Sequence, residues 1–279
     1  MKTLLASGLL LAAMATGSAA EMVYAYKVGA MEVFTLVETR STGGTGILVD
    51  GKGTRDAIKR YLPDGKFPME INAFLVKNGE KNILIDTGFG GAIIDGMRGV
   101  GVAPEQVNTV LITHTHGDHI GGLSTGGAAR FPNAELFLSQ PEQVWGSGNA
   151  ATVAALAPYA GRLRTFKPAA YDGDAVAVAD GITAIAAFGH TPGHTVYLLA
   201  SNGEKLLIGG DLFHVPAIQF PVPEVSVIYD SDPVAAAATR RQILEYVARE
   251  KIPVAGMHLH YPAIGTVEKN GDGFRWQAK

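Results

Sequence analysis

Three histidines and an aspartate stand close together directly after the apolar run at 107–112. In extended backbone the side chains at positions i and i+2 point to the same side, so His114 and His116 can share one cation. Asp118 and His119 follow beyond the predicted turn, where they suit a second cation beside the first. A structural histidine is usually isolated and satisfied by one hydrogen bond, whereas imidazole is the commonest metal ligand. The cluster therefore predicts a metal site.

None of the chain's eight histidines precedes position 114, and each group follows an apolar stretch typical of a buried strand. The four predicted strands that lead to metal-binding candidates span residues 107–113, 182–188, 205–210 and 253–257. Catalytic groups are usually carried by loops at one edge of a rigid core. We therefore expect these four strand ends to converge on one rim.

The chain contains no cysteine, so a bound metal must be held by nitrogen and oxygen, and neither a disulfide nor a lipidated cysteine can form. Its formal net charge is −3, and its basic residues are scattered rather than grouped. This pattern lacks the electrostatic footprint of a nucleic-acid-binding protein. We expect a small-molecule substrate, uncharged or weakly charged, and no nucleic-acid partner.

The first 20 residues have the pattern of a secretory signal peptide. Lys2 gives a positive start, residues 4–15 are mostly apolar, and Ser18-Ala19-Ala20 offers small residues for cleavage before Glu21. A short membrane anchor is the alternative, but the apolar stretch is below the roughly 20 residues that span a bilayer. The pattern predicts a periplasmic or secreted protein without a membrane anchor, whose residues 21–279 form one catalytic domain.

Three hairpins and one long helix are predicted elsewhere. The hairpins span 22–37, 71–85 and 196–208, and the second contains Asn78-Gly79, a pair that supplies positive φ angles to tight turns. Residues 42–65 are predicted as a loop with one short helix at 55–61. The long helix begins after Asp232, a good N-cap residue followed by proline, and ends near Glu250.

Asp86 ends the second strand of the hairpin at 71–85. A carboxylate in such a position often accepts a hydrogen bond from a ligating histidine and so orients its ring. We predict that role for Asp86, with an ordinary loop cap as the alternative.

The candidate ligands form four motifs, which are His114-x-His116-x-Asp118-His119, Gly189-His190-Thr191-Pro192-Gly193-His194, Gly210-Asp211 and Met257-His258. In this order and spacing they resemble the metallo-β-lactamase superfamily. The stretches 211–220 and 256–265 are similar, more narrowly, to its methyl parathion hydrolase branch, which includes lactonases and aryl esterases. The resemblance implies an α/β fold, a four-layer αββα sandwich with a dinuclear metal site at one edge.

The resemblance also implies a role for each candidate residue. The first metal would be bound by His114, His116 and His190, the second by Asp118, His119 and His258, and Asp211 would bridge the two. His194 and His260 match residues that support ligands rather than bind metal. Residues that could line a substrate pocket are Phe89, Trp145, Phe213 and His214. Each of the first three could instead belong to the core.

Such a site suits two divalent metal ions, with Zn²⁺ the best match and manganese, iron or cobalt as alternatives. Two cations convert a bound water to hydroxide near neutral pH, and Asp118 and Asp211 would serve the catalytic step. We predict an exported binuclear metallo-hydrolase for neutral, hydrophobic esters, lactones or phosphotriesters. The alternatives are a mononuclear iron enzyme of the sulfur dioxygenase type and a metal-binding protein without catalysis. A homodimer is compatible with an apolar pocket mouth.

Overall fold

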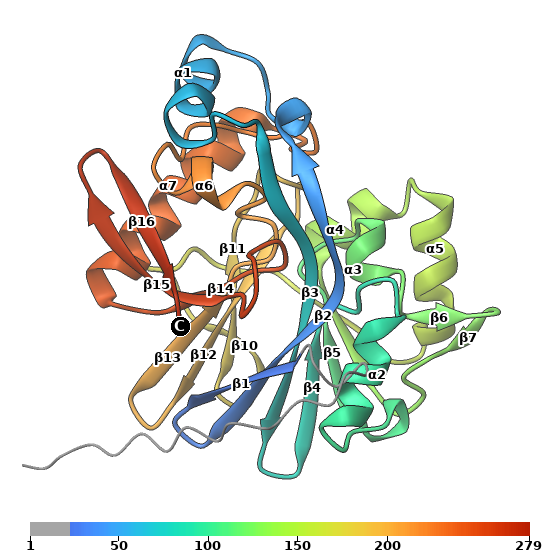
Figure 1. The fold of residues 1–279 in the computed structure, drawn as a ribbon. Coiled ribbons are helices and arrows are strands. Elements are labelled where there is room, and N and C mark those ends of the chain that lie inside the picture. Colours follow the sequence, from blue (N-terminus) through green and yellow to red (C-terminus); the bar gives the residue numbers. More distant parts are fainter. Residues whose placement is uncertain (1–22) are drawn as a thin grey trace, which may run out of the picture.

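The computed structural model describes residues 23–279, and the predicted signal peptide lies outside the described residues. Two seven-stranded sheets pack face to face (Figure 1). The strands of the first sheet, in spatial order, are β1 (Val23–Val28), β2 (Met31–Gly44), β3 (Lys66–Asn78), β4 (Lys81–Ile85), β5 (Thr109–Leu111), β8 (Glu135–Ser139) and β9 (Leu163–Phe166). Those of the second sheet are β10 (Val176–Ala179), β11 (Ile182–Ala186), β12 (Thr195–Ser201), β13 (Glu204–Ile208), β14 (Val254–Ala255), β15 (Ile264–Asn270) and β16 (Gly273–Ala278).

Helices cover the outer faces of both sheets. The α-helices are α1 (Lys52–Tyr61), α2 (Ala92–Gly99), α3 (Gly117–Ile120), α4 (Gln140–Gly146), α5 (Ala150–Leu156), α6 (Pro216–Gln219) and α7 (Pro233–Glu250). Short 3₁₀ turns occur at η2 (Thr45–Ile47), η3 (Pro104–Gln106) and η4 (Ala157–Tyr159), and β6 (Ser124–Thr125) pairs with β7 (Ala128–Ala129). None of the helices in residues 23–279 is long and apolar enough to cross a membrane.

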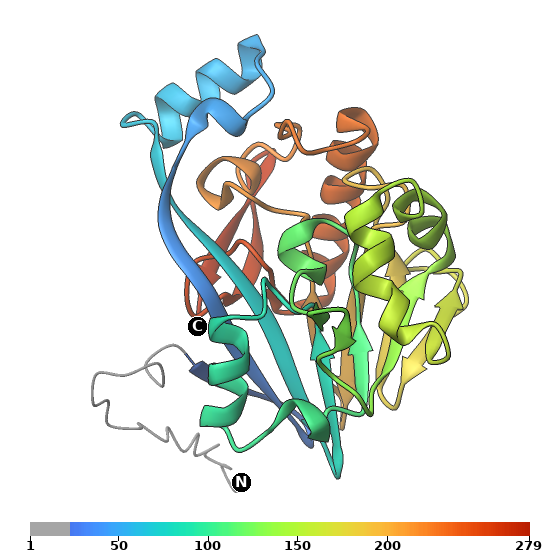
Figure 2. The same cartoon turned by 90° about the vertical axis from the view of Figure 1, so that its right-hand side faces the viewer.

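Two apolar clusters bind the layers together. The larger one fills the space between the sheets and includes Leu244 and Val247 of α7, so α7 packs on the second sheet. The other joins Ile93 and Met97 of α2 to Leu84 of the first sheet. The layer order is therefore helix, sheet, sheet, helix, which confirms the predicted αββα sandwich (Figures 1 and 2).

The predicted hairpins and the long helix are present, with differences of detail. The side chain of Asp232 accepts hydrogen bonds from the second and third backbone N–H groups of α7, as expected of an N-cap. The turn between β3 and β4 differs from the prediction, because only Gly79 has a positive φ, +59°. The Asn78 side chain instead donates to the carbonyl of Asp180, in the turn between β10 and β11 of the second sheet. Helix α1 begins three residues before the predicted start.

Strands β2 and β3 extend beyond the body of the first sheet and carry α1 at their far end (Figure 2). Their register shifts between Val37 and Thr39, a bulge that marks where the extension begins. We call residues 39–71 the arm. A third apolar cluster joins Leu48 and Phe67 of the arm to Ile218 of α6, which fixes the arm over one edge of the sandwich.

Candidate metal centre

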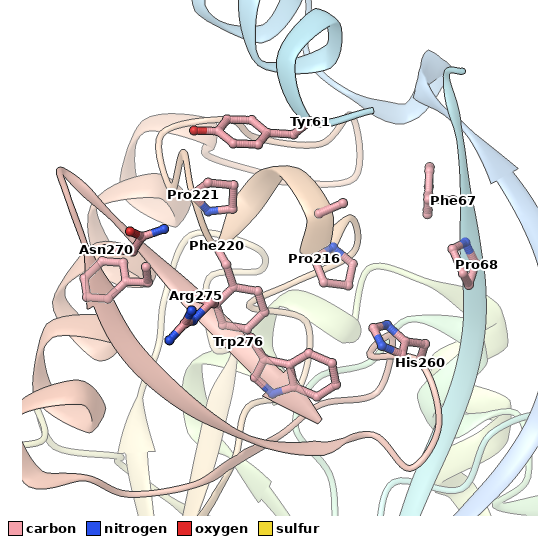
Figure 3. Close-up of a pocket in the computed structure, with 12 residues that line it drawn as sticks. Tyr61, Phe67, Pro68, Pro216, Phe220, Pro221, His260, Asn270, Arg275 and Trp276 are labelled. Atoms are coloured by element: carbon pink, nitrogen blue, oxygen red, sulfur yellow. The ribbon is translucent and has the colours of Figure 1, made fainter. Parts of the chain in front are cut away.

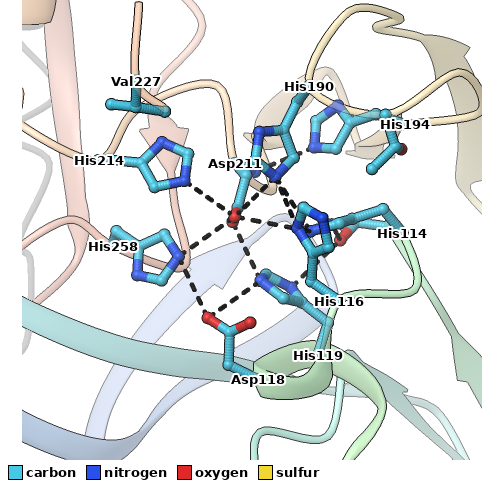
Figure 4. Close-up of polar contacts among 12 residues, drawn as sticks. His114, His116, Asp118, His119, His190, His194, Asp211, His214, Val227 and His258 are labelled. Atoms are coloured by element: carbon cyan, nitrogen blue, oxygen red, sulfur yellow. Dashed lines mark hydrogen bonds and ion pairs between the residues drawn. The ribbon is translucent and has the colours of Figure 1, made fainter. Parts of the chain in front are cut away.

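Four strand ends converge on this edge, as predicted. The loop after β5 carries His114 and leads into α3, while β11, β13 and β14 each end shortly before a further candidate ligand. The side chains that meet in Figure 4 include all seven predicted ligands, which are His114, His116, Asp118, His119, His190, Asp211 and His258.

The first cluster consists of three imidazole nitrogens that face a common point. Nε2 of His114 lies 2.9 Å from Nδ1 of His116 and 3.2 Å from Nε2 of His190, and the latter two atoms are 3.0 Å apart. A neutral imidazole has one N–H, so three rings cannot satisfy each other fully by hydrogen bonds. Nitrogens that share a tetrahedral zinc at ~2.0 Å lie about 3.3 Å apart, close to the observed spacing.

The second cluster combines a carboxylate with two imidazoles. Asp118 Oδ2 is 3.6 Å from His119 Nε2 and 3.5 Å from His258 Nε2. Asp211 lies between the clusters, because its Oδ1 is 3.2 Å from His119 Nε2 and its Oδ2 is 3.2 Å from His190 Nε2. The structure thus places Asp211 where one carboxylate reaches both groups of ligands.

Two features of these atoms fit bound cations. His119 Nε2 and Asp211 Oδ1 are buried and lack a hydrogen-bond partner, although such groups are normally paired. Burial lowers the pKa of His116 to about 4, with the neighbouring His190 adding to the effect, so this ring is neutral and able to bind metal. Burial also disfavours charge on His190, but Asp211 and Asp230 outweigh it and raise its pKa to about 9. A cation would replace the proton on His190.

Acceptor oxygens behind the ligands set their orientation. Asp86 Oδ2 lies 2.7 Å from Nδ1 of His119, so the structure places Asp86 where the predicted orienting role requires it. Asp230 Oδ1 does the same for His190 Nδ1, at 2.9 Å, and the backbone carbonyl of Glu70 accepts from His258 Nδ1, at 2.7 Å. Nothing in the sequence singles out Asp230 or Glu70, since neither belongs to a histidine motif.

His194 supports the site without facing it. Its Nδ1–H donates to the carbonyl of Ala187, and its Nε2 accepts from the backbone N–H of Asp211, each at 3.0 Å. Both ring nitrogens are therefore used, and burial lowers the pKa of this ring to about 3. The neutral ring fixes the backbone that carries the central carboxylate.

A cavity of about 300 Å³ opens onto the clusters. Besides four of the ligands, it is lined by Thr39, Ile47, Met69, Ile71, His214 and Tyr229. His214, a predicted pocket residue, stacks on His258 and places Nε2 3.1 Å from Asp211 Oδ2. Tyr229 is half exposed and brings a phenol to the wall, a group that the sequence alone did not identify.

The other predicted pocket residues do not line this cavity. Phe213 points into the core, where it stacks on Phe220, and the side chain of Phe89 is 53% exposed. Trp145 stands edge-on to His116 from outside the cavity, with ring centroids 5.6 Å apart. Phe213 is therefore a core residue, the alternative that the sequence left open, because the loop after β13 turns its ring toward Phe220 while Asp211 faces the ligands.

His260 does not support a ligand, contrary to the prediction from the sequence. Its imidazole stands edge-on to Trp276 in a separate cavity of about 380 Å³, between the arm and the hairpin of β15 and β16 (Figure 3). Only its neighbour His258 turns toward Asp211. Residues two apart in a loop need not share a side, since the alternation holds only in extended strands.

The sequence matches the family model described as the metallo-beta-lactamase superfamily over residues 67–258. The chain belongs to this superfamily. Its structure is similar to that of AbOPH, described as a hydrolase in the beta lactamase superfamily, with 30% identity, a TM-score of 0.81 and coverage of 91% of this chain and 96% of that one. It is also similar to AidC, described as a dizinc quorum-quenching lactonase, with 26% identity, a TM-score of 0.82 and coverage of 92% and 97%.

A curated relative is the uncharacterized protein YobT of Bacillus subtilis (strain 168), which is 29% identical over 152 residues. The match covers 52% of this chain and 63% of YobT, less than two thirds of that protein.

Proposed function

We propose that this member of the superfamily is a binuclear metal-dependent hydrolase of neutral, hydrophobic esters, lactones or phosphotriesters. The observation that carries the proposal is the cavity above the two ligand clusters. Among the described residues, its wall outside the clusters contains no lysine, arginine or glutamate, and Ile47, Met69 and Ile71 are apolar. A wall of this kind favours an uncharged substrate, and about 300 Å³ suits a small molecule.

The similarity to AidC and AbOPH supports the same reaction class, since one is described as a dizinc lactonase and the other as a hydrolase. The cluster of His114, His116 and His190 would hold one cation, and Asp118, His119 and His258 the other. Bound divalent ions would lower the pKa of a water and polarise the substrate's reacting oxygen. Of the two acids, Asp118 is the more exposed and lines the cavity, so it is placed to accept a proton.

The test compares turnover and metal content in one preparation. Zinc-loaded protein should contain about two metals per chain and should hydrolyse an uncharged lactone and an aryl phosphotriester, whose kcat/KM ratio then identifies the preferred class. Asp211→Ala should lose one metal and at least about 100-fold in kcat/KM while its secondary structure is unchanged. One iron per chain with oxygen consumption, or unchanged turnover by Asp211→Ala, would overturn the proposal.

A further inference from the structure

Glu142 is a fully buried carboxylate that belongs to neither ligand cluster. It lies in α4, yet both of its oxygens accept hydrogen bonds from loops that carry ligands. Oε1 accepts from the backbone N–H and the hydroxyl of Thr115, both at 2.8 Å. Oε2 accepts from the hydroxyl of Thr191 at 2.6 Å and from the backbone N–H of Gly193 at 3.1 Å. Four donors thus share one carboxylate.

Helix capping does not explain this arrangement. Ser139 is the N-cap of α4 and Glu142 is three residues later, the spacing at which a glutamate can turn back to the N-cap backbone. The Ser139 hydroxyl does accept from the Glu142 backbone N–H, but the Glu142 carboxylate points away to the two loops. The carboxylate therefore acts on the loops rather than on its own helix.

Both loops belong to the first cluster. Thr115 stands between His114 and His116, and Thr191 directly follows His190. The loop at Gly193 also has no spare room, because a Cβ there would lie 2.1 Å from the Glu142 backbone nitrogen. The first of these loops follows a strand of one sheet and the second a strand of the other. Glu142 thus joins the two halves of the first cluster from behind.

We infer that Glu142 is a positioning residue that sets the distance between His190 and the pair His114 and His116. The inference rests on the proposed metal site and goes beyond it, because it assigns the geometry of one cluster to a residue that binds no metal. Hydrogen-bonded partners behind ligands typically change metal affinity by about 10- to 100-fold when mutated.

The experiment measures zinc affinity with one cluster at a time. Asp118→Ala weakens the second cluster and His116→Ala the first, and Glu142→Gln is added to each. The glutamine amide has only one acceptor oxygen. In either orientation its NH₂ group therefore replaces an oxygen that accepts two hydrogen bonds in the wild type. Glu142→Gln should lower zinc affinity about 10- to 100-fold in the Asp118→Ala background and less than about 3-fold in the His116→Ala background.

Glu38→Gln is the matched control. Glu38 also accepts two backbone hydrogen bonds, from Gly91 and Ile93, but at the start of α2 rather than on a loop that carries ligands. It should leave zinc affinity unchanged in both backgrounds. Equal zinc affinity with and without Glu142→Gln in the Asp118→Ala background would overturn the inference, even if the metal-free protein became less stable.

If Glu142→Gln does not fold, a second variant, Thr191→Val, tests the same inference. Thr191→Val is nearly isosteric and removes only the 2.6 Å donor, so it should lower zinc affinity of the first cluster by a smaller factor in the same direction. Unchanged affinity in that variant would also overturn the inference. Zinc binding is independent of turnover, so an inactive protein that binds two zinc ions would contradict the proposed function and leave this inference standing.

Discussion

Three histidines present Nε2 to the metal centre because their opposite ring nitrogens are already bound. The acceptors are the Asp86 carboxylate for His119, the Asp230 carboxylate for His190 and the Glu70 carbonyl for His258. A proton held at Nδ1 leaves the Nε2 lone pair free for a cation. The ligand set is therefore prepared by groups that never touch the metal.

Asp86→Asn tests this preparation. An amide can keep the hydrogen bond from the Thr113 backbone at Oδ1, but its NH₂ group then replaces Oδ2, which faces both His119 Nδ1 and the Thr113 hydroxyl. We expect zinc affinity of the second cluster to fall about 10- to 100-fold, measured by competition with a chromophoric chelator. Wild-type affinity in a folded variant would show that the ring needs no acceptor.

Tyr229→Phe tests the hydroxyl on the cavity wall. A lactone releases a poor leaving group that gains from a hydrogen-bond donor, whereas an aryl oxide leaves without one. We expect kcat/KM to fall roughly 100-fold for a lactone and to change little for an aryl ester. Equal losses for both substrates would indicate that Tyr229 only shapes the wall.

The sequence was sufficient for the ligands and for Asp86 and His194 behind them, but not for the other supporting groups. His114, His116, Asp118 and His119 stand in one short motif, and their closeness in the sequence is enough to keep them near one another. Asp230 and Glu142 meet their partners across 40 and 27 residues, contacts that only the packed fold creates. Of the residues that line the cavity, Ile47, Met69 and Ile71 could not be predicted for a similar reason, since the long pairing of β2 with β3 brings them there.

At the scale of elements, α7 connects the core to a ligand loop. Its inner face packs on the second sheet, and its first turn meets Gly189, where a Cβ would lie 2.2 Å from the Ala236 backbone nitrogen. Gly189 has a φ of +127°, a backbone angle that residues with a Cβ rarely adopt, so glycine is needed here. The start of α7 and the His190 loop are thus fixed together.

Asp232→Ala should destabilise this start. The Asp232 side chain accepts from the backbone N–H groups of Val234 and Ala235, which would otherwise be unpaired. We expect the free energy of unfolding to fall by about 0.5–2 kcal/mol in chemical denaturation. Asp232→Asn can still cap the helix, so it should stay near wild type. A loss as large in the asparagine variant would point to charge rather than capping.

At the scale of the whole molecule, the ligands come from both halves of the sandwich. His114 and His119 follow a strand of the first sheet, and His190, Asp211 and His258 follow strands of the second. The αββα architecture was predictable because these motifs, in this order, resemble those of the metallo-β-lactamase superfamily. The arm was not, because the long pairing of β2 with β3 leaves no short-range signal in a glycine-rich segment.

Chelation should lower the melting temperature, since metal bound only by the folded state stabilises it. Free metal at 1,000 times its Kd contributes about 4 kcal/mol. For a chain of this size the melting temperature should fall on the order of 10 °C after chelation and recover when zinc is returned. Magnesium added instead is the control. No change on chelation would mean that the clusters hold no stabilising cation.

The ligands and the apolar cavity wall lie on different parts of the fold, because the arm supplies much of the wall. The ligands lie on loops that follow core strands of both sheets, whereas Ile47, Met69 and Ile71 lie on an extension fixed by its own small apolar cluster. Substitutions there can reshape the cavity while the reactive centre is retained. During evolution, substitutions in the arm can therefore change which substrates fit, while the ligands and the reaction they support stay the same.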